Sequence, residues 1–489
     1  MDKTVAICLG FPPEGPFGDY TSYEKAATEH FNQLAKLTAD VSKPLRSQAA
    51  QLLTHLDPSI HSLSYLTILH DAFLPSLAGD KLALSHRLVQ FLLCFDPIQI
   101  RYAAGHMSQL LVYVASGQAL PPSVAVHVLS TAILRIDPTS TMLTVHHTNL
   151  AKLAYNTNNI DPALSVLDKD IVFYPGMGNN KKPNSLADPS LSPAVFMTES
   201  RGFTTALKTP AILEYDLLRG MIYCSRRDWP RALSAFERVV NYPTRDFGAS
   251  KIMTEAYKKW ILVSLLCHGR LISPPASVGS GATKAYGVLG KSYKDLASIF
   301  ETENANDLKE KANTSSEEWL TDGNTGLVRE VLSAYQEWQI QNLQQIYTKI
   351  SIGEIRQQTK SAQTGDILQN DDDVEALIQN MIISGMLKGV IQRNDNGTSY
   401  LTFLPAAAAL AEEQVKDELV AASGRLAALV PILKATNERL STSKEYIKHL
   451  SKERLKGGQD REGDSTMDLG PSFDEEDLMG DSPAMNDPY

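Results

Sequence analysis

Paired histidines and a glycine-containing run before a lysine are the two features of this 489-residue sequence that could support catalysis. A zinc hydrolase places two histidine ligands as His-x-His or His-Glu-x-x-His, so that both rings reach one ion. None of the eleven histidines has either spacing. His146 and His147 are adjacent, and on a helix their side chains would point about 100° apart. We therefore expect two ordinary helical histidines there and no metal site.

The run Gly287-Val288-Leu289-Gly290-Lys291-Ser292 is similar to the end of a phosphate-binding loop. The full motif has another glycine five residues before Gly290, but Ala285 occupies that position. The segment before it, 273–283, is rich in Ser, Pro and Gly and is not a buried strand. The run therefore predicts a loop that leads into a helix. No Gly-x-Ser-x-Gly elbow in a strand-turn-helix setting is present either, so we predict no catalytic residue, no cofactor and no enzymatic activity.

The composition favours a helical protein of a reducing compartment. Hydrophobic residues make up 43% and charged residues 21% of the chain, and aromatic residues are sparse. In the segment 456–489 ten acids face two cations, so this tail carries −8 of the net charge of −10. The four cysteines form no CxxC pair, which argues against a disulfide framework and a zinc ribbon. No apolar run approaches the ~20 residues of a membrane span, and we predict a protein of the cytoplasm and nucleus that binds no membrane.

A short motif that recurs in the first part of the chain indicates how it is organised. This recurring mark is an apolar residue followed by Asp-Pro. It occurs at Asp57-Pro58, Asp96-Pro97, Asp137-Pro138 and Asp161-Pro162. Asp is a strong N-cap, and Pro at the first helical position loses no hydrogen bond within the helix. Each mark therefore predicts the start of a helix.

The clearest repeat lies between Leu213 and Pro243. Gly220, Tyr223, Ala232 and Phe236 have the offsets 0, 3, 12 and 16 that a tetratricopeptide unit gives its small and aromatic residues. We expect the two small residues to let two antiparallel helices approach, and the two aromatic rings to fill the groove between them. Asp228-Trp229-Pro230 predicts the start of the second helix.

A weaker copy of this unit surrounds Ala163, which precedes Ala232 by 69 residues, about two repeat lengths of ~34. Units that bury their apolar face only by stacking predict an extended array. We therefore predict a mostly α protein whose tetratricopeptide-like repeats form a right-handed superhelix. Two surface loops, 175–193 and 273–283, are expected to interrupt it.

A winged helix is predicted after residue 349. Ser351 can cap a short helix, and apolar residues at helical spacing follow from Asp373 until Gly385, a natural C-cap. Two apolar, strand-like runs then flank Asn394-Asp395-Asn396-Gly397, and Asn-Gly between such runs is a strong hairpin signal. Two helices followed by a two-stranded wing are typical of a helix-turn-helix relative.

The charge of this segment argues against nucleic acid. A groove-reading helix presents cations and amides to DNA, but the helix 373–384 contains no Lys or Arg. Across 351–404 seven acids face four cations, a net charge of −3. We predict instead that the exposed wing pairs with another protein. The expected contact residues are Ile391, Tyr400, Leu401 and Phe403.

A long helix is predicted from Ala406 to about Lys456. Leucine or isoleucine recurs every seven residues along it, with further apolar positions between, which predicts a seam for packing against other helices. The seam residues expected to contact partners are Leu419, Leu426, Leu429, Leu433, Leu440 and Ile447. A helix folded back on its own domain is the alternative. The acidic tail, 457–489, is predicted to be disordered.

Several of these segments resemble a known family. The runs 351–355, 374–382 and 385–391 resemble the PCI domain, which the proteasome lid, the COP-nine signalosome and a translation initiation factor share. Four further runs are similar to the family of third subunits of the COP-nine signalosome: 218–223, 232–233, 255–265 and 324–328. The likeness extends from about Leu213 to Phe403 and is only architectural before Asn149.

This resemblance implies a non-catalytic scaffold subunit of the complex that removes NEDD8 from cullin-RING ubiquitin ligases. Its chemistry would belong to a different, metal-bearing subunit. The implied partners are other signalosome subunits, both PCI and metal-bearing, and cullin-RING ligases through the complex. A PCI scaffold subunit of the proteasome lid and a winged-helix nucleic-acid adaptor remain the alternatives.

The predicted organisation has five parts. They are N-terminal helical repeats (1–205), the helical-repeat part of a PCI domain (206–348), its winged helix (349–405), the C-terminal helix (406–456) and the acidic tail (457–489).

Overall fold

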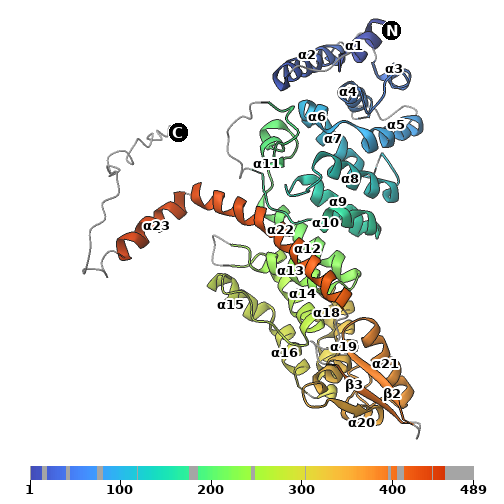
Figure 1. Ribbon diagram of the computed structural model, residues 1–489, viewed down its shortest axis with the longest axis vertical. Helices are drawn as coiled ribbons and strands as arrows, with labels where there is room; N and C mark the ends of the chain where they lie inside the picture. The colour runs from blue at the N-terminus through green and yellow to red at the C-terminus, as the bar shows by residue number, and fades with distance from the viewer. Residues whose placement is uncertain are drawn as a thin grey trace. The chain divides into compact units, whose positions relative to one another are not determined.

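A computed structural model of the protein is mostly helical (Figure 1). It describes residues 2–13, 19–39, 45–73, 81–117, 119–175, 185–243, 248–302, 304–394, 398–404, 412–442 and 444–457. The chain divides into two units, Met1–Leu410 and Ala411–Tyr489, and each is described by itself. The predicted acidic tail lies outside the described residues beyond Gly457.

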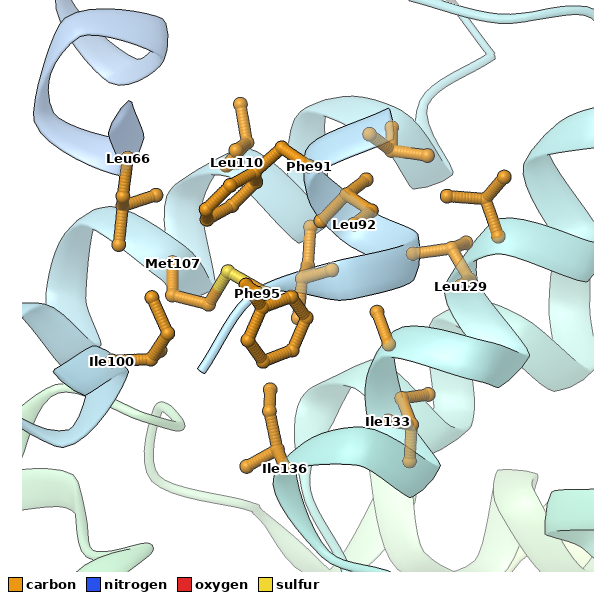
Figure 2. Packing of buried hydrophobic residues seen from close by; sticks show 14 of the residues in the cluster. Leu66, Phe91, Leu92, Phe95, Ile100, Met107, Leu110, Leu129, Ile133 and Ile136 are labelled. Carbon is orange, nitrogen blue, oxygen red and sulfur yellow. The ribbon is translucent and has the colours of Figure 1, made fainter. Parts of the chain in front are cut away.

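Short helices packed on their neighbours form the first part of the larger unit. They are α1 (Asp2–Leu9), α2 (Tyr20–Ala39), α3 (Leu45–Leu52), α4 (Ser62–Phe73), α5 (Lys81–Cys94), α6 (Pro97–Ile100), α7 (Ala104–Ala115), α8 (Pro122–Ile136), α9 (Val145–Thr157), α10 (Asp161–Leu167) and α11 (Pro193–Phe196). One continuous core joins them, and Figure 2 shows part of it, where Phe91 of α5 and Phe95, which follows α5, lie among side chains of α7 and α8. Helices stacked in this order confirm the predicted repeat architecture.

The Asp-Pro marks have two different structures. The Asp96 carboxylate accepts a hydrogen bond from the Ile98 N–H and caps α6, and α10 begins at Asp161, so these two predictions are confirmed. At Asp57 and Asp137 the prediction is wrong. There the carboxylate also accepts the N–H of the residue two positions later, but a turn follows, and α4 and α9 begin only at Ser62 and Val145.

The predicted tetratricopeptide hairpin is formed by α12 (Thr209–Ser225) and α13 (Trp229–Val240). The Asp228 carboxylate accepts from the Arg231 N–H and caps α13. A Cβ at Gly220 would lie 2.4 Å from Cε1 of Phe236, so only glycine permits this approach. Phe236 is buried against Gly220 as expected, and Tyr223 is also buried, with its hydroxyl donating to the Leu167 carbonyl oxygen of α10.

Six helices complete the repeat region around a second core. They are α14 (Lys251–His268), α15 (Ser280–Leu289), α16 (Lys291–Phe300), α17 (Ala305–Thr314), α18 (Ser316–Thr321) and α19 (Thr325–Leu343). The run 287–292 is not the loop that the sequence predicts, because α15 continues to Leu289 and α16 begins at Lys291. Gly290 separates them, and a Cβ there would lie 2.8 Å from Cε1 of Tyr257.

The predicted surface loop 175–193 is partly internal. Among its described residues, Ser185, Leu186 and Ala187 are buried. Arg101 donates to the carbonyl oxygens of Leu186 and Asp188 and lies over the Phe196 ring. Composition predicted a solvated loop, but this buried guanidinium fixes the backbone against the first core.

The winged helix has the predicted helices and hairpin and one further strand. Its elements are β1 (Lys349–Ser351), α20 (Ile352–Gln358), α21 (Asp371–Ile383), β2 (Gly389–Arg393) and β3 (Ser399–Phe403). The Ser351 hydroxyl accepts the Glu354 N–H and caps α20, and Gly385 follows α21 with a φ of +76°. The antiparallel sheet has the order β1-β3-β2, so β3 is the central strand.

The smaller unit contains α22 (Glu412–Thr442) and α23 (Lys444–Gly457). These two helices confirm the helical prediction over most of 406–456. Residues 405–411 and Ser443 lie outside the described residues.

Candidate protein-interaction surfaces

The adjacent histidines of α9 are structural. The Thr144 hydroxyl lies 2.8 Å from Nδ1 of His147, and the Ser140 hydroxyl lies 2.8 Å from its Nε2. His146 places Nε2 3.1 Å from the Phe203 carbonyl oxygen. Burial lowers the pKa of His146 to about 4 and that of His147 to about 3, so both are neutral at pH 7. Their hydrogen bonds fix the start of α9 and the segment near Phe203.

The described residues show no group of three or more His, Cys, Asp or Glu side chains that could hold a metal ion. Among the described helices, none has both the length and the apolar character needed to cross a membrane.

The wing places the four predicted contact residues in different environments. Ile391 pairs with Leu401 across β2 and β3, and Leu401 and Phe403 are buried in the core of the winged helix. Ile391 is half-buried against the same core. Tyr400 belongs to the other face, where Lys349 Nζ lies 5.0 Å from its ring centroid.

The two edge strands of this sheet are the three-residue β1 and the longer β2. The central strand β3 uses both of its backbone edges to pair with β1 and β2. Val390, which is 45% exposed, lies on β2 and was not among the predicted contact residues. Its alternation with Ile391 was the signal that could have identified it, since neighbouring strand residues point to opposite faces.

Two ion pairs lie within the winged helix. Arg356 Nε lies 2.7 Å from the Asp371 carboxylate, and Arg393 lies 3.2 Å from Glu375. The first turn of α21 carries three consecutive aspartates, 371–373. A helix with this acidic start would repel DNA phosphates, which agrees with the predicted absence of nucleic-acid binding.

The helices of the smaller unit carry the predicted apolar seam on their surface. The six seam residues are 41% to 65% exposed: Leu419, Leu426, Leu429, Leu433, Leu440 and Ile447. Val420 and Val430, which the heptad pattern did not include, are exposed to a similar extent. Between Leu419 and Leu433 the apolar surface therefore extends beyond the two heptad positions that form the predicted seam.

Helical hairpins followed by a three-stranded winged helix define a class of helical-repeat proteins with a PCI domain, and a family model of the PCI domain matches residues 303–398. A second model matches residues 26–280, with the description "COP9 signalosome complex subunit 3, N-terminal helical repeats". The chain belongs to the COP9 signalosome complex subunit 3 family. The predicted boundary at 205/206 coincides with neither matched range and stays a prediction.

Two relatives are similar over almost their whole length. COP9 signalosome complex subunit 3 of Neurospora crassa is 38% identical over 501 residues, which cover 99% of this chain and 100% of that protein. The protein of the same name from Emericella nidulans is 30% identical over 495 residues, which cover 96% of this chain and 97% of that protein.

Proposed function

We propose that this chain is a non-catalytic scaffold subunit of the COP9 signalosome, the complex that removes NEDD8 from cullin-RING ubiquitin ligases. The observation that carries the proposal is the exposed apolar seam of α22 and α23, in a chain whose full-length relatives are named as subunits of that complex. Isopeptide hydrolysis would then belong to a metal-bearing subunit, and this chain would hold subunits in place.

The seam is suited to permanent contacts. Fully burying a leucine or isoleucine side chain contributes about 1.5–3 kcal/mol, and six such side chains lie along the two helices at 41% to 65% exposure. Even after the entropy of association is subtracted, a surface of this kind can hold a subunit in a stable complex. Partner helices with their own heptad seams are the matching surface.

The edge of β2 is the second proposed contact. Its outer N–H and C=O groups have no strand beside them in the sheet order β1-β3-β2. A strand from a neighbouring subunit can add to this edge, with Val390 and Tyr400 on the outer face of the sheet. Leu401 and Phe403 would then support the contact from the core, and their side chains would not touch the partner.

Purification of the tagged full-length chain from its native cells, with mass spectrometry of the bound proteins, tests the proposal. Co-purification of a metal-bearing deneddylase, other PCI subunits and a cullin is the expected result. Co-purification of proteasome ATPases would identify a proteasome-lid subunit instead and would overturn the proposal.

A further inference from the structure

A groove lies within the larger unit, where the repeat region meets the winged helix. Its cavity of about 760 Å³ is lined by the turn between α12 and α13, by one face of α19 and by the C-terminal end of α21. A second cavity of about 580 Å³ shares Arg227, Trp229 and Glu330 with it. Together these cavities can accommodate several side chains of an extended peptide.

Large apolar side chains form much of the groove wall. Trp229, Trp338, Met381 and Met386 all line it. The Trp338 ring lies against the backbone of Gly269, where a Cβ would be 2.4 Å from its Cε3. The absence of a side chain at Gly269 therefore fixes one wall of the groove.

The charge of the groove is incompletely paired. Arg227 donates to Glu330 at 2.7 Å, and the two side chains close one end of the cavity. One helical face of α19 carries Glu330 and, two turns later, Glu337. Among the described residues no Lys, Arg or His forms an ion pair with Glu337. Partial burial, with a contribution from Glu330, raises the pKa of the Glu337 carboxyl.

Four acids line the two cavities, and three of them have a cation beside them. Glu255 pairs with Lys259 at 3.1 Å, Asp322 with Lys258 at 2.6 Å and Glu330 with Arg227 at 2.7 Å. Among the described residues, Glu337 is therefore the acid of this lining that has no ion pair. A half-buried carboxylate without a counter-ion gains most from a cation that also covers it, because burial strengthens the attraction.

We propose that this groove binds an extended peptide segment of a partner protein through one arginine or lysine, whose charge pairs with Glu337. The tryptophan rings and Met386 cover the aliphatic stem of that side chain, and cation–π contact with Trp229 or Trp338 adds to the attraction. An acidic peptide is excluded, because its carboxylates would face Glu337, which has no counter-ion.

Panning a phage library of random 12-residue peptides on the full-length chain tests this proposal. We expect selected peptides to share a basic residue at one fixed position, flanked by apolar residues. The same panning on the Glu337→Gln variant should lose this basic position, and the Glu317→Gln variant, which removes an exposed acid of α18 outside the groove, should retain it. Peptides without a common basic position, or with an unchanged one in Glu337→Gln, would overturn the proposal.

Affinity measurements on one selected peptide give the size of the contribution that Glu337 makes to binding. Fluorescence anisotropy should show a Kd at least tenfold weaker for Glu337→Gln, and similarly weaker when the basic residue of the peptide is replaced by glutamine. The two changes together should cost little more than either alone, since both remove the same ion pair. Fully additive losses would contradict the assigned contact. Matched thermal melting of the variants excludes misfolding as the cause.

Discussion

The helices α13 and α22 have similar apolar residues but opposite surroundings. Phe236 and Val240 of α13 are buried by α12 and α14, whereas Leu426 and Leu433 of α22 are about two-thirds exposed. Apolar residues at helical spacing stabilise a fold only when other groups cover them and remove them from water. The difference shows that α13 stabilises the chain itself, and it supports the proposal that α22 uses its apolar surface to bind other chains.

The largest effect that tests this comparison is expected at Phe236. Phe236→Ala should lower the free energy of unfolding by about 3–5 kcal/mol, because it removes a buried ring from the contact with Gly220. Leu429→Ala, made as the matched change on the exposed seam, should lower it by less than about 0.5 kcal/mol. Urea unfolding of the purified full-length variants measures both. Equal losses would show that the seam is packed within the chain.

Acid should destabilise the buried region through its neutral histidines. The pKa of His147 is about 3 in the folded chain and about 6.5 when unfolded, so the unfolded state binds more protons between these values. The contribution of His147 to the free energy of unfolding is complete above pH 6.5 and falls as the pH decreases toward 3. Between pH 7 and pH 5 the expected loss is about 2 kcal/mol.

A His147→Gln variant should lose that part of the pH dependence, even though it also loses hydrogen bonds and stability at pH 7. Urea unfolding at pH 7 and pH 5 gives the slope of the free energy of unfolding against pH for the wild type and for the variant. His449 of α23 lies in the exposed helix, and a His449→Gln variant provides the control, with the wild-type slope. A His147→Gln variant that keeps the wild-type slope would show that this histidine is not buried neutral.

A smaller effect is expected at the cap of α13. Asp228→Ala removes the carboxylate that accepts the Arg231 N–H and should cost about 1 kcal/mol. Asp228→Asn keeps a capping oxygen and should recover most of the loss. Thermal unfolding of the two variants compares them, and equal melting temperatures would mean that the cap contributes nothing measurable.

The parts of the fold that depend on local rules could be predicted from the sequence. The Gly220–Phe236 contact, the Asp228 and Ser351 caps and the turn at Gly385 all follow from residue type and spacing. At Asp57 the same dipeptide begins a turn, although its carboxylate accepts the N–H two residues later as that of Asp96 does, so this local bond does not distinguish a turn from a helix start. The three-residue strand β1 has too few residues to show a period.

The candidate surfaces were predictable to different degrees. The seam of α22 follows from a heptad pattern, which fixes the face without further information. In the wing, alternation shows that Tyr400 and Leu401 face opposite sides but not which side is buried, and the packing of α20 and α21 against one face decides this. The groove at Glu337 could not be predicted, because its walls come from helices far apart in the sequence.

Incorporation of a seam variant into the native complex tests the central claim most directly. The Leu426→Glu, Leu433→Glu double variant should fold with unchanged stability but should no longer co-purify with the other signalosome subunits. A control with a glutamate at Gly424, which is exposed on the opposite side of the same helix from Leu426 and Leu433, should assemble normally. Normal assembly of the Leu426, Leu433 variant would contradict the account.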